Sequence, residues 1–267
     1  MTAVKPDRRP VLALVDADVL VYQAAAGAEK IISLDGETLA PVCRLSDAFE
    51  VFENKLDSLL RKTHAKDFLL CFSDGTENNF RRAVWPGYKA NREGKPRPVI
   101  LSHLKRFCME EYPDRHILRP CLEADDCLGI LATRASFRPG RRKVICSIDK
   151  DLRGLPGNFF DLRHPEGGVL RIAPEAADLW FITQTLTGDP TDNYPGCPGI
   201  GPVTAHKLLK DAGPDMAALW AVVLAAYEKA GLTEADALAQ ARVARILRAS
   251  DYDFKQKKVK LWNPPKV

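Results

Sequence analysis

The chain has 267 residues, of which 46% are hydrophobic and 28% charged, which predicts a soluble globular protein with one domain and a subdomain, or two small domains. No run of eighteen apolar residues occurs, so no membrane span is expected. The N-terminus lacks a signal peptide's cleavage pattern, so a cytoplasmic protein is expected. Seven cysteines without a CxxC pair argue against a disulfide framework and a zinc site.

Short apolar runs alternate with helical patterns in the first two thirds of the chain. Buried strands are predicted at 11–17, 67–73, 116–120 and 143–149. One helix is predicted after the first strand and as far as Ala28. Others are predicted from Ser46 to about Lys62, from about Pro98 to Glu111, and at 123–135. A hairpin is expected around Pro165–Gly168, and the pattern from Pro174 onward is helical almost to the end. This order predicts an α/β sheet domain followed by a helical subdomain.

Three of the predicted strands end in an aspartate, namely Asp16, Asp74 and Asp149. The carboxyl ends of parallel strands share one edge of a sheet, where ligands bind, so these side chains are expected to gather there. A single aspartate in this position is commonly a helix cap, and that alternative weakens when three occur together.

Further acids are expected at the same edge. Glu123, Asp125 and Asp126 open a predicted helix, Asp149 and Asp151 bracket Lys150, and two more acids lie in the stretch GDPTDN. So many carboxylates cannot stand together unpaired, and a hard divalent cation such as Mg²⁺ or Mn²⁺ would neutralise them. The alternative is acids that favour helix N-termini, which explains single members but not the set. The nine candidates are Asp16, Asp74, Glu123, Asp125, Asp126, Asp149, Asp151, Asp189 and Asp192.

Basic residues are unevenly distributed around a net charge of +4. Eight Lys/Arg lie between Arg81 and Arg106 against the single acid Glu93, and five lysines follow Asp253 without an acid. Basic clusters of this kind indicate a polyanionic partner, although a solvated face is the alternative for either cluster alone.

Six motifs in this order resemble the 5′ nucleases, a family that includes phage 5′–3′ exonucleases, flap endonucleases and the 5′ nuclease domain of bacterial DNA polymerase I. The motifs are LVDADVLVYQ, FSDG, FRRAVWPGYKANR, LEADD, SIDKDL and TGDPTDNYPGCPGIGPVTA, within residues 11–210. The resemblance is strongest to the phage enzymes. It implies a PIN-like α/β domain over 1–180 with a mainly parallel sheet and a helical arch at about 85–111. It also implies a helix-three-turn-helix subdomain of the helix-hairpin-helix type over 181–250, and a basic tail at 251–267.

The resemblance further implies two Mg²⁺ or Mn²⁺ sites. Asp16, Asp74, Glu123, Asp125 and Asp126 would serve mainly the first site, and Asp149, Asp151, Asp189 and Asp192 the second. Lys89 and Arg92, which would share a helix face, are expected to act on the scissile phosphate, with Tyr88 stacking on the terminal base. The residues expected to contact DNA are Arg81, Arg82, Gly196, Gly199, Ile200, Gly201 and Lys207. The loop at 196–201 could also hold K⁺ against a DNA phosphate. Val203 departs from the lysine common in the family.

The implied function is metal-dependent 5′–3′ exonuclease or structure-specific 5′ flap endonuclease activity on DNA. DNA with 5′ ends, flaps or nicks would be bound without sequence specificity by a monomer, with replication proteins as candidate partners. Two alternatives are a PIN-type ribonuclease, which normally lacks the PGxPGIG subdomain, and a non-catalytic DNA-binding module, which would have lost some of the nine acids. A nucleotide-binding ATPase is disfavoured because the chain has no GxxxxGK[ST] motif.

Overall fold

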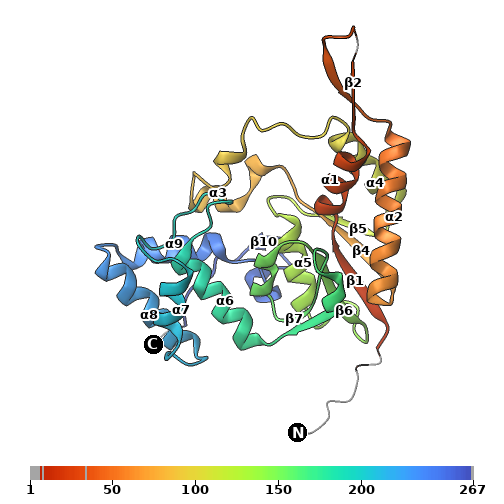
Figure 1. Ribbon diagram of the computed structural model, residues 1–267. Coiled ribbons are helices and arrows are strands. Elements are labelled where there is room, and N and C mark those ends of the chain that lie inside the picture. The colour runs from red at the N-terminus through yellow and green to blue at the C-terminus, as the bar shows by residue number, and fades with distance from the viewer. Residues whose placement is uncertain (1–6, 8, 34, 266–267) are drawn as a thin grey trace.

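The computed structural model describes residues 7, 9–33 and 35–265, and a six-stranded sheet forms its centre (Figure 1). Its strands are β1 (Val11–Asp16), β4 (Ala65–Phe72), β5 (His116–Leu118), β6 (Arg142–Ser147), β7 (Gly157–Asp161) and β8 (Val169–Ile172). They lie in the order β5-β4-β1-β6-β7-β8, and every neighbouring pair is parallel except β7 with β8. The predicted mainly parallel sheet and the hairpin at its end are both confirmed.

The central strand β1 is buried along its whole length. Its sequence VLALVD shows no polar alternation, as expected for a parallel strand covered on both faces. Ala13 and Val15 belong to the core on one face, whereas Leu12 and Leu14 belong to the core on the other. Because β1 pairs in parallel with both β4 and β6, the carboxyl ends of these three strands lie at one edge.

Helices cover both faces of the sheet. One face packs against α1 (Ala17–Ala28), α2 (Leu45–Thr63) and α4 (Leu101–Glu111), and the other against α5 (Ala124–Thr133). The helix predicted from Ser46 begins at Leu45, and no side chain caps its N-terminus.

The helical part of the chain forms a third core beside the sheet domain. It contains α6 (Pro174–Thr187), α7 (Pro202–Leu209), α8 (Met216–Lys229) and α9 (Glu234–Ala244). α6 contacts the other three helices, so residue 180, the expected domain boundary, lies inside the helix that organises this core. Among the described residues, no helix has the length and apolarity needed to cross a membrane.

Two hairpins were not expected. β2 (Lys30–Ser33) and β3 (Leu39–Val42) form one that projects from the body at the top of Figure 1. β9 (Tyr252–Asp253) and β10 (Lys258–Val259) form the other, within the segment expected to be a basic tail. Tyr252 is buried in the α5-side core, so this segment is folded rather than a free tail.

The segment expected to be a helical arch is mostly irregular. After α3 (Phe80–Val84), the only helical element before Ile100 is a 3₁₀ turn at Ala90–Arg92 in this fully described stretch. The two prolines and two glycines of residues 86–96 account for the missing helix. The following helix α4 buries Leu104 and Cys108 against the sheet domain, so it belongs to the body.

Candidate active site

The three strand-end aspartates lie at the same edge of the sheet, as the sequence predicts. Asp16 ends β1, while Asp74 and Asp149 follow the neighbouring parallel strands β4 and β6. The Asp74 carboxylate accepts the backbone N–H of Cys121 at 2.9 Å, and so binds the loop that leads into α5.

Asp16 is held in place by two neighbours. Its carboxylate accepts the Ser147 hydroxyl at 2.6 Å and the backbone N–H of Val19 at 3.3 Å, which caps α1. Burial, opposed by the Ser147 hydrogen bond and assisted by the charges of Asp18 and Asp149, raises the pKa of Asp16 to about 7. The helix-cap alternative and the acid-cluster prediction therefore both apply to this residue.

Asp125, Asp149 and Asp151 line the same cavity within the acid cluster. Asp149 accepts the backbone N–H of Asp151 at 2.8 Å and thereby fixes the 3₁₀ turn after β6. Burial, together with the charges of Asp149, Asp16 and Glu123, raises the pKa of Asp125 well above its ordinary value. Burial and repulsion from Asp149 and Asp189 raise the pKa of Asp151 to about 7. Asp125 and Asp151 therefore lack the counter-charge that full ionisation requires.

The loop after α6 brings Asp189 and Asp192 to this cluster. Gly188 and Gly196 both have left-handed φ, of 64° and 67°, and a Cβ on either would lie within 2.5 Å of the other's segment. This close approach requires glycine at both positions. It lets Asp189 pair with Tyr194 through two backbone hydrogen bonds, N–H to O distances 2.9 and 3.2 Å. The loop thus places Asp189 beside Asp151 and Asp192 beside Glu123.

Lys89 and Arg92 bind acids of the cluster. Lys89 Nζ lies 2.6 Å from Glu123 Oε1 and 3.6 Å from Asp192 Oδ2, and Arg92 forms an ion pair with the other oxygen of Asp192. Burial opposes ionisation of Glu123, but Lys89 and Arg81 outweigh it and leave the pKa of Glu123 below its ordinary value. The expectation of a shared helix face is wrong, because Lys89 has a left-handed φ of 56° and precedes the 3₁₀ turn containing Arg92.

Asp126 and Arg81 do not have the roles expected of them. Asp126 is fully buried and accepts two hydrogen bonds from the Arg81 guanidinium, at 2.7 and 2.8 Å. It also accepts the backbone N–H of Leu247 at 3.1 Å, so its oxygens face protein donors rather than the acid cluster. Arg81 is 2% exposed and donates to the backbone oxygens of Val243 and Arg245, so it is not placed to contact DNA.

Tyr88 is also placed differently from the expectation. Its side chain is 2% exposed, and its hydroxyl lies 2.8 Å from Glu123 Oε2 and 3.1 Å from Asp192 Oδ2. Burial and the charge of Glu123 raise its pKa well above the ordinary value, so the phenol stays protonated and donates. A ring buried in this way cannot stack on a base, and Tyr88 instead orients the two carboxylates.

A clasp of hydrogen bonds joins residues 85–92 to the loop 190–193. The Trp85 indole N–H donates to Asn193 O at 2.9 Å, and Asn193 Nδ2 donates to Gly87 O at 2.7 Å. The backbone N–H of Lys89 donates to Asp192 O at 2.9 Å. Asn193 has a left-handed φ of 57°, which asparagine tolerates better than most residues. The clasp fixes Lys89 relative to Asp192, although sequence reasoning gave Trp85 and Asn193 no role.

The loop at 196–201 divides into buried and exposed parts. Gly196 is buried and its N–H donates to Gln240 Oε1 at 2.9 Å, while the N–H of Ile200 donates to Cys197 O at 3.2 Å. The backbone N–H groups of these two residues therefore have acceptors within the protein, and their expected contact with DNA stays a prediction. Gly199 and Gly201 are exposed just before α7 and Lys207 is exposed in its last turn, and the expected DNA contact of all three stays a prediction. Arg82 pairs with Glu93 at 2.9 Å in the preceding segment, and its expected DNA contact also stays a prediction.

Two further residues, Asp18 and Ser147, belong to this edge. Asp18 accepts the backbone N–H of Ser73 at 2.7 Å and pairs with Lys105 Nζ at 2.9 Å. Ser147 donates to Asp16 and accepts the backbone N–H of Asp149 at 3.0 Å. Sequence reasoning missed them, although Asp18 stands two residues after a strand-end aspartate and Ser147 two residues before one.

The donor chemistry of the cluster fits a hard divalent cation. Its free groups are carboxylate oxygens, and Asp151 Oδ1 is buried without a hydrogen-bond partner. Repulsion among Asp16, Asp125, Asp149 and Asp151 is the charge imbalance that such a cation would relieve. Within residues 7, 9–33 and 35–265, however, no three acid, histidine or cysteine side chains already converge as metal ligands.

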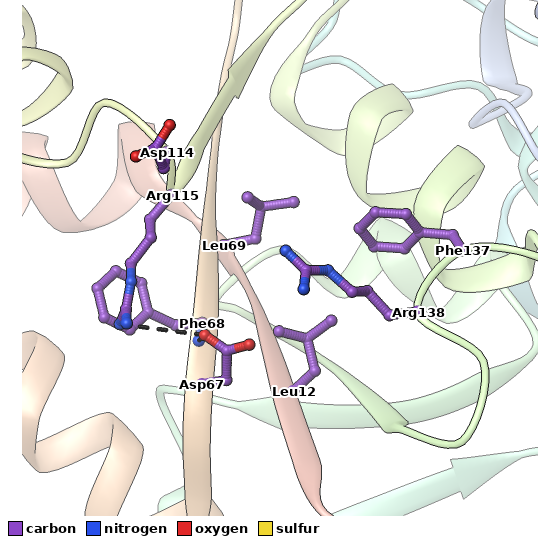
Figure 2. A pocket seen from close by; sticks show the side chains of 8 residues that line it. All are labelled: Leu12, Asp67, Phe68, Leu69, Asp114, Arg115, Phe137 and Arg138. Carbon is purple, nitrogen blue, oxygen red and sulfur yellow. Dashed lines mark hydrogen bonds and ion pairs between the residues drawn. The ribbon is translucent and has the colours of Figure 1, made fainter.

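The structure has a cavity at each of two opposite edges of the sheet. One lies within the cluster and is lined by Arg81, Tyr88, Glu123, Asp125, Asp149, Asp151, Gln184, Asp192, Tyr194, Val243, Ala244 and Ile246. The other, of about 230 Å³, lies where β1 and β4 begin. Figure 2 shows its side chains, with Arg115 directed to Asp67 and Arg138 lying over Leu12 and Leu69. None of the predicted site residues lines this larger cavity, so the candidate site is the acidic one.

Comparison with known proteins relates the chain to phage nucleases. Residues 11–163 match the family model described as 5′-3′ exonuclease, N-terminal resolvase-like domain. The chain is 32% identical to the exodeoxyribonuclease of Enterobacteria phage T3, with 94% of this chain and 92% of that protein covered. It is also 32% identical to the exonuclease of Escherichia phage T7, covering 94% and 93%.

The fold is similar to that of the phage T5 5′-exonuclease in a structure with divalent zinc ions bound. The TM-score is 0.55 at 16% identity, with 87% of this chain and 93% of that chain covered. At this identity the likeness shows the fold alone, and it is the expected PIN-like α/β fold.

Proposed function

The chain belongs to the 5′-3′ exonuclease family, and from this premise we propose that it hydrolyses DNA phosphodiester bonds near 5′ ends, as an exonuclease or a flap endonuclease. The observation that carries the proposal is the convergence of acids from five separate segments on one sheet edge, with Lys89 held among them. Such a cluster favours phosphoryl chemistry over binding alone, because the repulsion it stores has no structural benefit.

The acid cluster is the proposed site of a pair of divalent cations, Mg²⁺ or Mn²⁺. Asp16, Asp125 and Asp149 would hold one, together with Glu123 and Asp74, while Asp151, Asp189 and Asp192 would hold the other with Asp149. When bound, such cations supply Lewis-acid stabilisation of charge on a phosphate. Asp126 is left out of this set because its oxygens are already occupied by Arg81 and Leu247.

The chain's own cations orient and neutralise the scissile phosphate. Lys89 is held at Glu123 and Asp192 by the clasp, so it needs only a side-chain rotation to reach a phosphate between them. Arg92, whose side chain is 43% exposed, can offer a bidentate contact from the solvent side. Tyr88 and Ser147 hold carboxylates in place by donating hydrogen bonds.

DNA is proposed to be bound through its backbone and therefore without sequence specificity. Gly199 and Gly201 lie exposed just before α7, whose first turn offers free N–H groups that favour an anion, and Lys207 is exposed in the last turn of the same helix. A K⁺ ion at this loop, action as a monomer and binding to replication proteins remain parts of the proposal.

Replacing Lys89 by alanine is expected to lower kcat by about 100-fold to 1000-fold, because a charge aimed at the phosphate is lost. The dissociation constant for DNA should change only a few-fold, since most affinity comes from other backbone contacts. Single-turnover cleavage and anisotropy titration measure the two quantities. Lys95→Ala, an exposed lysine of the same segment, is the matched control and should cleave normally. Loss of binding with unchanged kcat would instead make Lys89 a positioning contact.

Replacing Asn193 by glycine tests the clasp. The change removes the Nδ2 bond to Gly87 O, keeps the backbone oxygen that accepts from Trp85, and suits the left-handed φ. We expect kcat to fall about tenfold or more, because displacement of Lys89 by a fraction of an ångström misaligns it. The melting temperature should stay near that of the parent, since the side chain is exposed. Equal kcat in the two proteins would show that the clasp does not position Lys89.

The proposed activity is tested with end-labelled duplex, nicked and 5′-flap DNA in Mg²⁺, with and without EDTA. We expect the DNA strand to be shortened from its 5′ end in Mg²⁺, and to stay intact when EDTA is added. A matched 5′-flap RNA separates the ribonuclease alternative. Cleavage of the RNA but not the DNA would overturn the proposal, and binding of DNA without cleavage would favour the non-catalytic module.

A further inference from the structure

The outer side of α5 carries a basic surface that the catalytic machinery does not use. We name it the α5 basic surface, and it consists of Arg119, Arg134, Lys255, Lys257 and Lys258. Arg119 and Arg134 flank the helix, and the three lysines come from the hairpin β9–β10 that packs beside it.

The lysines are held on a folded turn. Tyr252 pairs with Val259 and Asp253 with Lys258 across the hairpin. The Asp253 carboxylate accepts the backbone N–H groups of Lys255 and Gln256, both at 2.9 Å. This closes the turn and keeps the lysine side chains exposed on one short loop.

The two arginines are held by aromatic rings. Arg134 Cζ lies 3.8 Å from the centre of the Phe254 ring, and Arg119 Cζ lies 4.9 Å from that of Tyr252. The two rings pack edge to face, with centres 5.3 Å apart. Guanidinium groups held in this way lose less conformational entropy when they bind an anion.

All five charges are available for a partner. In the part of the chain that the structure describes, none of them lies within 4.0 Å of a carboxylate, whereas nearby Lys260, Arg245 and Arg248 are paired. Five unpaired cations on one side of one helix repel each other. Binding a polyanion would relieve this repulsion, so the surface is suited to a polyanionic partner.

The surface begins beside the active edge. Arg119 stands four residues before Glu123, the residue that precedes α5, and Arg134 directly follows the helix. Both guanidiniums lie over the same ring, with Arg119 Cζ 5.9 Å and Arg134 Cζ 3.8 Å from the centre of Phe254, so the two charges stand at most about 10 Å apart. That separation suits two or three neighbouring phosphates along one strand of a duplex, at about 3.4 Å each.

We propose that the α5 basic surface binds the phosphate backbone of duplex DNA, as a contact separate from the loop at 196–207. The inference rests on the proposed DNA nuclease function. A duplex is favoured over a single strand because the arginines cover the aromatic rings, and single-strand binding usually relies on bases stacking on such rings. The same surface would contact any sequence, because phosphates carry none.

The test compares two triple charge reversals of equal net charge. K255E/K257E/K258E changes the surface, and R61E/K62E/K66E changes exposed cations at the end of α2 and start of β4, on the opposite face of the sheet. Binding to a blunt duplex is measured by anisotropy in EDTA over a range of salt concentrations, beside single-stranded DNA of the same length. Thermal melting confirms that both variants fold.

We expect the surface variant to bind duplex about tenfold more weakly or worse, with a salt slope reduced by about 2–3, while the control variant changes less than threefold. Equal loss in both variants, no loss in either, or loss for single strands alone would overturn the inference. If the unaltered protein cleaves flap DNA in Mg²⁺ and the surface variant binds duplex normally, the DNA-binding role of the α5 basic surface is ruled out and the proposed nuclease function stands. If the unaltered protein neither binds nor cleaves DNA, both the α5 basic surface proposal and the proposed nuclease function are ruled out.

Discussion

Asp126→Asn is expected to lower the free energy of unfolding by about 3–5 kcal/mol, because it leaves the buried Arg81 guanidinium without its counter-charge. The pair is bidentate, at 2.7 and 2.8 Å, with both side chains almost inaccessible to solvent. Arg81 also ties α3 to the backbone at Val243 and Arg245, and Asp126 ties α5 to Leu247. The pair therefore joins the sheet domain to the end of the helical part, and its loss should loosen both.

Urea unfolding of Asp126→Asn measures the effect, and the adjacent Asp125→Asn is the matched control. Asp125 lies in the acid cluster, where burial and neighbouring charges already raise its pKa, so its neutralisation should leave stability unchanged or increase it. Arg81→Met combined with Asp126→Leu should recover part of the loss, since apolar residues can replace a buried ion pair. Asp126→Asn with parental stability but no cleavage would return Asp126 to the metal ligands.

The sheet and its acidic edge were predictable from local sequence. β1 ends in an acid, and β4 and β6 are each followed by one two residues later; parallel pairing then brings those ends together regardless of how the intervening loops run. The hairpin β7–β8 was predictable because its turn residues stand between two β-rich runs. These features depend on short stretches of chain and on a rule for sheet edges.

The roles of Asp125 and Asp126 were not predictable in this way. They are adjacent on α5, about 100° apart, and which of them faces the cavity depends on a partner 45 residues away, Arg81. Lys89 shows the same limit, because its left-handed backbone follows from a bond to Asp192 far along the chain. Gly196 fits a phosphate-binding pattern, but its missing Cβ serves close packing on Gly188. Residue type alone does not separate these uses.

Asp149→Asn is expected to lower cleavage by about 1000-fold or more while DNA binding remains measurable. Asp149 is the acid that the others share: its charge raises the pKa of Asp16, Asp125 and Asp151. A cation bound there is expected to supply several kcal/mol of transition-state stabilisation, and each 1.36 kcal/mol corresponds to about tenfold in rate. The asparagine oxygen can still accept the N–H of Asp151, so the turn after β6 should persist.

Asp161→Asn provides the matched control, since Asp161 also ends a strand of the sheet but accepts only from its own segment, at Arg163. It should cleave DNA at the parental rate. Titration with Mn²⁺ gives a readout independent of turnover: Asp149→Asn should bind the ion more weakly, and Asp161→Asn as the parent does. Because repulsion in the cluster falls when one acid is neutralised, Asp149→Asn should also melt no lower than the parent. Parental cleavage by Asp149→Asn would mean that the acidic edge is not where the phosphodiester bond is broken.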